Sequence, residues 1–159
     1  MKNKQNIVPI IGITVLILIA LLKACSVGNT SSAKPSPTVP FDEVIATIDK
    51  STNDTFGTKG DYSVEVKDTI ILVNVWSPDV TSGALKAAKD PSVKADWDKM
   101  TEQFVTAQKS LQNYVDRCGY TDYTVSLDIM NSINTERALL VVSKGQVLYD
   151  IVNGVDKLS

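Results

Sequence analysis

The stretch DPSVKADWDKMTEQFVTAQKSLQNYVDRCG, residues 90–119, decides the fold of this 159-residue chain. It opens with Asp90 as a good N-cap and Pro91 at the first helical position, and it closes with Gly119, which favours the left-handed turn after a helix. Between these ends, apolar residues recur in steps of four and three: Val93, Trp97, Met100, Phe104, Ala107, Leu111, Tyr114 and Cys118. This period predicts one long helix with a single apolar face, about 40 Å long at roughly 1.5 Å per residue.

Strand patterns lie on both sides of this helix: YSVEVKDTIILVNVW (62–76) before it, and YTVSLDIM (123–130), ERALLVVS (136–143) and QVLYDIVNG (146–154) after it. The first is predicted to be a hairpin with a tight turn near Lys67 and Asp68, and Lys144 with Gly145 makes a second hairpin turn. The sequence therefore predicts an α+β domain in two layers. An antiparallel sheet of about five strands, formed by a hairpin and, after the helices, a three-stranded meander, packs one face against the long helix.

Two shorter helices are predicted before the long one. PFDEVIATIDK, residues 40–50, places four apolar residues at the i, i+3, i+4 and i+7 spacing of one helical face. STNDTFGTKGD, residues 51–61, is predicted to be a turn-rich loop. SPDVTSGALKAAKDP, residues 77–91, predicts a short helix that begins at Thr81 or Ser82.

The N-terminal part of the chain is a membrane-directed segment. MKNK gives a positive leader, and IVPIIGITVLILIALL, residues 7–22, is an uncharged apolar run. Its length falls between the core of a signal peptide, about 7 to 15 residues, and a spanning helix of about 20. Residues 1–24 are therefore predicted to be either a signal peptide or a retained membrane anchor. Residues 25–40, rich in Ser, Thr and Pro, are predicted to be a flexible tether, which leaves 41–159 as one extracytoplasmic α+β domain.

The sequence Leu22-Lys23-Ala24-Cys25 resembles a bacterial lipobox, in which a signal peptidase cuts before the cysteine. Leu22, Ala24 and Cys25 match that pattern, whereas Lys23 stands where the family has a small uncharged residue. In this feature the chain resembles the small membrane-anchored lipoproteins, of unknown function, of Gram-positive bacteria. The resemblance covers four residues, and it implies a diacylglycerol on Cys25. A lipoprotein and an uncleaved signal-anchor both place the domain on the outer face of the cytoplasmic membrane.

The composition argues against several classes of function. Histidine is absent, so Ser-His-Asp and Cys-His catalysis and His-containing zinc sites are excluded. The two cysteines, Cys25 and Cys118, are too few for a four-cysteine metal site. From Cys25 onward, 13 basic against 18 acidic side chains give a net charge of −5, which disfavours nucleic-acid binding. No cofactor is predicted.

Trp76 is the residue that the sequence singles out as a candidate interaction anchor, because it ends a predicted strand beside a proline-bearing loop. The alternative is that Trp76 closes the core. Three acidic residues near the start of the long helix, Asp96, Asp98 and Glu102, are candidates for a cation site. A favourable interaction with the helix dipole explains them better.

The sequence thus predicts a membrane-tethered binding domain with no evident catalytic apparatus, whose partner is a protein or an envelope ligand. Two alternatives stay open. One is a small cell-envelope hydrolase that uses paired carboxylates, for which the candidate acids are Asp79, Asp122, Asp128 and Asp150. The other is a surface-exclusion or immunity lipoprotein of a phage or plasmid.

Overall fold

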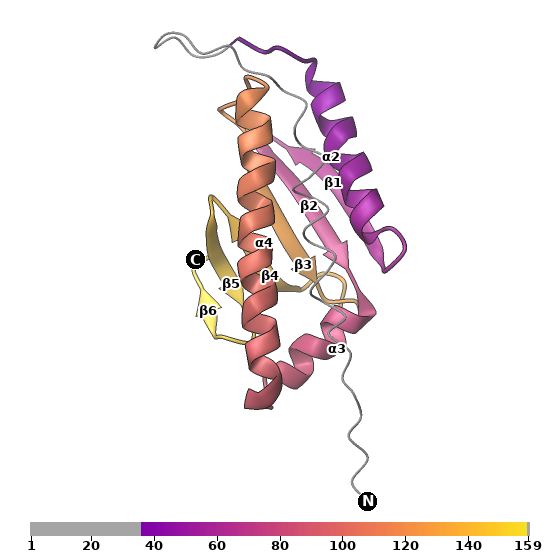
Figure 1. Cartoon of the computed structure of the whole chain (residues 1–159), viewed down its shortest axis with the longest axis vertical. Helices are drawn as coiled ribbons and strands as arrows, with labels where there is room; N and C mark the ends of the chain where they lie inside the picture. The colour runs from indigo at the N-terminus through magenta and orange to yellow at the C-terminus, as the bar shows by residue number, and fades with distance from the viewer. Residues whose placement is uncertain (1–35, 159) are drawn as a thin grey trace, which may run out of the picture.

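The computed structural model describes residues 36–158, which fold into a layer of helices and a layer of strands, as Figure 1 shows. The predicted α+β class is confirmed. The elements are α2 (Phe41–Phe56), β1 (Asp61–Lys67), β2 (Ile70–Trp76), α3 (Pro78–Ala87), α4 (Pro91–Arg117), β3 (Thr124–Met130), β4 (Ala138–Ser143), β5 (Gln146–Asp150) and β6 (Val155–Asp156). Cys25, the lipobox-like residues and all but the end of the expected tether lie outside the described residues. Within residues 36–158, no helix has the length and hydropathy to cross a membrane.

The sheet departs from the prediction in one strand pair and in its strand number. Six strands lie side by side in chain order, and β2 and β3 are parallel while the other neighbours are antiparallel. The parallel pair arises because α3 and α4 connect the two strands, and α4 carries the chain back to the end of the sheet where β2 begins. The additional strand is β6, whose two residues pair with Tyr149 and Asp150.

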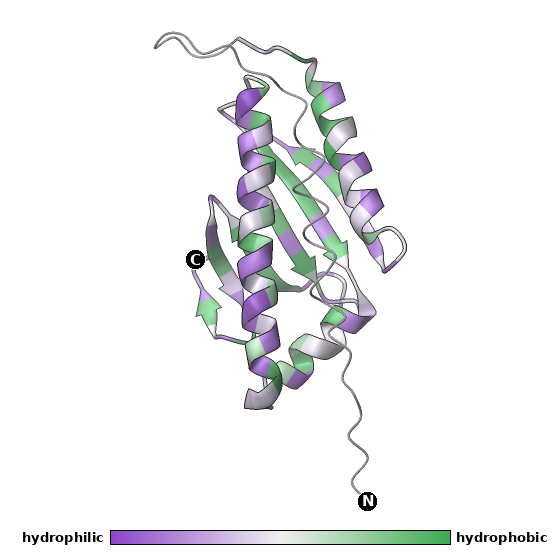
Figure 2. Ribbon diagram, in the orientation of Figure 1, coloured by the Kyte–Doolittle hydropathy of each residue, from purple (hydrophilic) through white to green (hydrophobic). Residues whose placement is uncertain are grey.

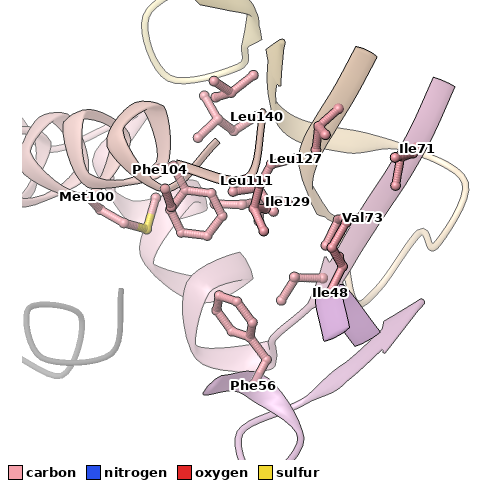
Figure 3. Close-up of a cluster of buried hydrophobic side chains, with 14 of the residues drawn as sticks. Ile48, Phe56, Ile71, Val73, Met100, Phe104, Leu111, Leu127, Ile129 and Leu140 are labelled. Carbon is pink, nitrogen blue, oxygen red and sulfur yellow. The ribbon is translucent and has the colours of Figure 1, made fainter. Parts of the chain in front are cut away.

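The core lies between the sheet and the helices on one of its faces. The stripe of α4 is buried from Trp97 through Cys118, and α2 packs beside α4, with the rings of Phe56 and Phe104 6.1 Å apart. Figure 3 shows Met100, Phe104 and Leu111 of α4 and Phe56 of α2 with side chains of the strands, namely Ile71, Val73, Leu127, Ile129 and Leu140. In Figure 2 the central strands are largely hydrophobic, while α4 carries polar residues on its outer side.

Two helix boundaries differ from the prediction. Helix α2 continues to Phe56 through residues predicted to form a loop, because its last turns are buried and Phe56 packs against Phe104. The hydroxyls of Thr52 and Thr55 each donate to the carbonyl four residues earlier, at 2.8 Å, which gives these buried groups a partner. Helix α3 begins at Pro78, before the predicted start, because Ser77 accepts a hydrogen bond from the Val80 amide and serves as its N-cap.

Two glutamines of α4 bind the backbone of the sheet. Gln108, which is fully buried, donates to the Val125 carbonyl and accepts from the Gly145 amide, both at 2.8 Å. Gln112 donates to the Tyr123 carbonyl and accepts from the Val125 amide, again at 2.8 Å. These bonds supply partners to buried backbone groups and fix the position of α4 along β3.

The chain enters the domain at the C-terminal end of α4. The Thr38 amide donates to the Cys118 carbonyl at 3.1 Å, and the Tyr120 hydroxyl donates to the Val39 carbonyl at 2.8 Å. Gly119 has a φ of +94°, and a Cβ at this position would lie 2.7 Å from the Pro37 backbone. The residues 37–39, here called the strap, therefore dock against the end of α4 although they belong to the segment predicted to be a tether.

Candidate functional site

A groove of about 730 Å³ lies at the end of the domain opposite the strap. Its walls come from two separate parts of the chain, namely the consecutive helices α3 and α4 (the latter at its start) and the β3–β4 loop (residues 131–137). The apolar residues that line it are Pro78, Leu85, Val93 and Ile133. The groove is thus a hydrophobic surface at one end of the molecule.

Each of the two helices of the groove begins at a side-chain N-cap. Helix α3 begins at Pro78 beside its cap Ser77, and α4 begins beside its cap Asp90, whose carboxylate accepts from the Ser92 amide at 2.9 Å and the Ser92 hydroxyl at 2.7 Å. These hydrogen bonds lower the pKa of Asp90. Because the turn between the helices is short, Leu85 and Val93 face the same groove.

The β3–β4 loop is held against α3 by side-chain hydrogen bonds. Thr81, which is buried, donates through its hydroxyl to the Ser132 hydroxyl at 3.2 Å and accepts from the Ser132 amide at 3.0 Å. Asn131 accepts at its side-chain oxygen from the amides of Ile133 and Asn134. The Ile133 side chain is 80% exposed on this loop. Ile133 is therefore exposed on a turn whose backbone is held in place by hydrogen bonds.

Trp76 lies beside this region but does not line the groove. It ends β2 on the face of the sheet that no helix of residues 36–158 covers, with Asp61 and Met130 as its cross-strand neighbours. Its indole nitrogen donates to the Thr135 carbonyl at 3.3 Å. This hydrogen bond links Trp76 to the β3–β4 loop. The interaction role predicted for Trp76 stays a prediction.

Two lysines supply positive charge to the groove. Lys86 and Lys89 are exposed, and within residues 36–158 neither forms an ion pair. The next lysine along the chain, Lys94, is engaged by Asp98 at 3.0 Å. The groove therefore combines an apolar floor with two unpaired ammonium groups.

The acids considered for hydrolysis lie in different parts of the fold. Asp79 is exposed in the first turn of α3, and Asp122 lies in the turn after α4. Asp128 is partly buried on the uncovered sheet face, where it accepts from the Ser126 hydroxyl at 2.7 Å, and burial raises its pKa to about 6. Asp150 is buried on the opposite face and accepts from the Trp97 indole at 3.0 Å. These four carboxylates lie on different elements and faces, so the fold does not form the predicted acid–base pair from them.

Of the three acids of α4 that the sequence offers as a cation site, Asp98 is engaged by neighbouring side chains. Asp98 accepts from the Asn153 side chain at 3.0 Å and from Lys94, and these contacts lower its pKa. Among the described residues, no three His, Cys, Asp or Glu side chains are grouped so as to hold a metal ion.

Sequence reasoning missed the groove. Its one local signal is Ile133, an isoleucine in the predicted turn NSINT, where polar residues are expected. Leu85, which is 41% exposed, gives no such signal, because its helix is too short to show a reliable apolar face in the sequence. The chain matches no protein-family model, no curated protein and no solved structure.

Proposed function

We propose that this protein is a membrane-tethered binding domain on the outer face of the cytoplasmic membrane, and that the groove receives its protein or envelope ligand. The observation that carries the proposal is the pair Leu85 and Ile133, 41% and 80% exposed on the same groove. Large apolar side chains exposed on a fixed concave surface are typical of interaction sites.

The position of the strap supports this arrangement. The strap lies at the C-terminal end of α4 and the groove at its N-terminal end, and Figure 1 shows that α4 runs the length of the domain between them. A helix of 27 residues spans about 40 Å. A domain that is anchored through its N-terminal segment thus presents the groove away from its point of attachment.

The tether is tested by the intact mass of the membrane-extracted protein, with Cys25→Ser as the control. A lipoprotein is expected to lack residues 1–24 and to carry a diacylglycerol that the control lacks. The full uncut chain in the membrane fraction means a signal-anchor, which keeps the proposed location. A full-length chain in the soluble fraction contradicts the tether.

The groove is tested by photo-crosslinking in cells that produce the full chain. A crosslinker at Ile133 is expected to yield one dominant adduct, identified by mass spectrometry, whereas a crosslinker at the exposed Ala46 of α2 yields none. Leu85→Gln is expected to remove the adduct because it places a polar group in the apolar wall. Ile151→Gln is the matched control, since Ile151 is also 41% exposed but lies in the turn after β5. Equal labelling from both crosslinker positions contradicts a binding role of the groove.

A further inference from the structure

We infer that the ligand of the groove is an acidic polypeptide segment, in which one or two large apolar side chains are flanked by Asp or Glu. This inference rests on the proposed function, and it specifies the chemistry of the partner. Its grounds are the charge of the groove, the composition of its walls and its place in the domain.

The charge of the groove is opposite to that of the domain. From Cys25 onward the chain carries a net charge of −5, yet Lys86 and Lys89 stand together on the groove without an ion pair in residues 36–158. The acid among the lining residues is Asp90, whose carboxylate caps α4 through Ser92. Its negative charge offsets one of the two ammonium groups, so the charged residues that line the groove leave a net charge of +1. Two unpaired ammonium groups beside an apolar floor favour carboxylates on the partner and repel basic partners.

The walls of the groove favour apolar side chains over a small polar ligand. Its volume of about 730 Å³ accommodates a few large side chains. Pro78, Leu85, Val93 and Ile133 supply the contact surface. The hydroxyl of Thr81 and that of Ser132 bond to each other, so they offer few free hydrogen-bonding positions to a sugar or a nucleotide.

The position of the groove favours a polypeptide over an anionic lipid. Ten residues lie between Cys25 and Ser36, so the eleven Cα–Cα steps from one to the other reach at most about 40 Å when fully extended. Helix α4 alone has about that length. The groove reaches the bilayer to which its own tether is attached only if the tether lies fully extended along the domain. A protein segment that approaches from the side away from the membrane has no such restriction.

The test uses the full chain in lipid nanodiscs with labelled methyl groups. The probes are two synthetic peptides with the same Leu-Phe centre, one flanked by glutamates and the other by lysines. The glutamate peptide is expected to shift the methyl resonances of Leu85, Val93 and Ile133, and the lysine peptide is not. Raising the ionic strength from about 0.1 M to about 1 M is expected to weaken binding, because it shortens the screening length to about 3 Å.

The charge contribution is tested by variants. Lys86→Glu combined with Lys89→Glu is expected to weaken binding of the glutamate peptide about tenfold. Lys99→Glu combined with Lys157→Glu makes the same change of net charge at exposed positions outside the groove, and it is expected to leave the affinity within about twofold.

Three outcomes overturn the inference: equal binding of both peptides, no methyl shift with either, or methyl shifts caused by phosphatidylglycerol vesicles in place of the peptides. If the peptides fail while the Ile133 crosslink in cells still depends on Leu85, the groove has a ligand of other chemistry, and the proposed function stands without this inference. If the crosslink fails as well, both the inference about the ligand and the proposed function of the groove are wrong.

Discussion

Trp97→Ala is expected to lower the free energy of unfolding by about 4 kcal/mol, as a large-to-small change in a packed core. The Trp97 side chain is 2% exposed on the buried stripe of α4. Its indole nitrogen donates to Asp150 at 3.0 Å, and Asp150 is itself 1% exposed. The substitution therefore leaves a cavity and removes one donor from a buried carboxylate, and both effects act in the same direction.

Trp97→Phe separates these two effects, because it keeps most of the ring and loses the indole N–H. It is expected to cost about 2 kcal/mol, the range for a hydrogen bond to a charged group. Asp150 keeps the amides of Val152 and Asn153 as donors, at 2.9 and 3.1 Å, which limits the loss. Urea unfolding of the full chain, followed by circular dichroism, measures both variants. A loss below about 1 kcal/mol for Trp97→Ala would mean that the α4 stripe does not face the core.

Asp128→Asn is expected to raise the free energy of unfolding by about 2 kcal/mol at pH 7 and to change it little at pH 4. Burial raises the pKa of Asp128 to about 6, above the value of about 3.9 expected in the unfolded chain. Between these values the folded protein holds a proton that the unfolded chain has released, so stability falls as the pH rises through this window. At pH 7 the folded protein carries the cost of a partly buried carboxylate, and asparagine removes that cost.

Urea titrations of the wild-type chain and of Asp128→Asn at both pH values measure this effect. Asp61→Asn is the matched control, since Asp61 is an exposed acid on the same sheet face, and its effect is expected to stay within about 0.5 kcal/mol. The Ser126 hydroxyl, which bonds Asp128 at 2.7 Å, can also bond an asparagine oxygen, so the substitution keeps that contact. Equal stability of the two proteins at pH 7 would contradict the raised pKa.

The sequence predicted those elements whose signals are local. Both caps and the full length of α4 followed from one unbroken apolar period and its flanking Asp90 and Gly119. The turn at Lys144 and Gly145 has positive φ at both residues, 51° and 70°, as a two-residue hairpin of type I′ requires. Such features depend on residues close together in the chain, so the local sequence is enough to predict them.

The elements that were predicted wrongly depend on tertiary structure. The parallel pairing of β2 with β3 depends on the path of α3 and α4, and strand alternation says nothing of direction. The extension of α2 to Phe56 depends on packing against Phe104, which outweighs the weak helix propensity of Ser, Thr and Asn. The groove joins residues 78–93 to residues 132–133, which are distant in sequence, and its one local signal in the sequence is Ile133.

The strap also determines where a mechanical load enters the domain. A force applied to the chain before Ser36 acts first on two hydrogen bonds of the strap, one from Thr38 to Cys118 and one from Tyr120 to Val39. Only then does it act on α2. The ring of Phe41, at the start of α2, packs at a tilt against Tyr120 and Tyr123, with centroids 4.9 and 4.5 Å away, so the force then spreads over an aromatic cluster at that same end. The groove lies at the other end of α4, about 40 Å away, so a pull on the anchor loads the strap and this aromatic cluster before it reaches the groove walls.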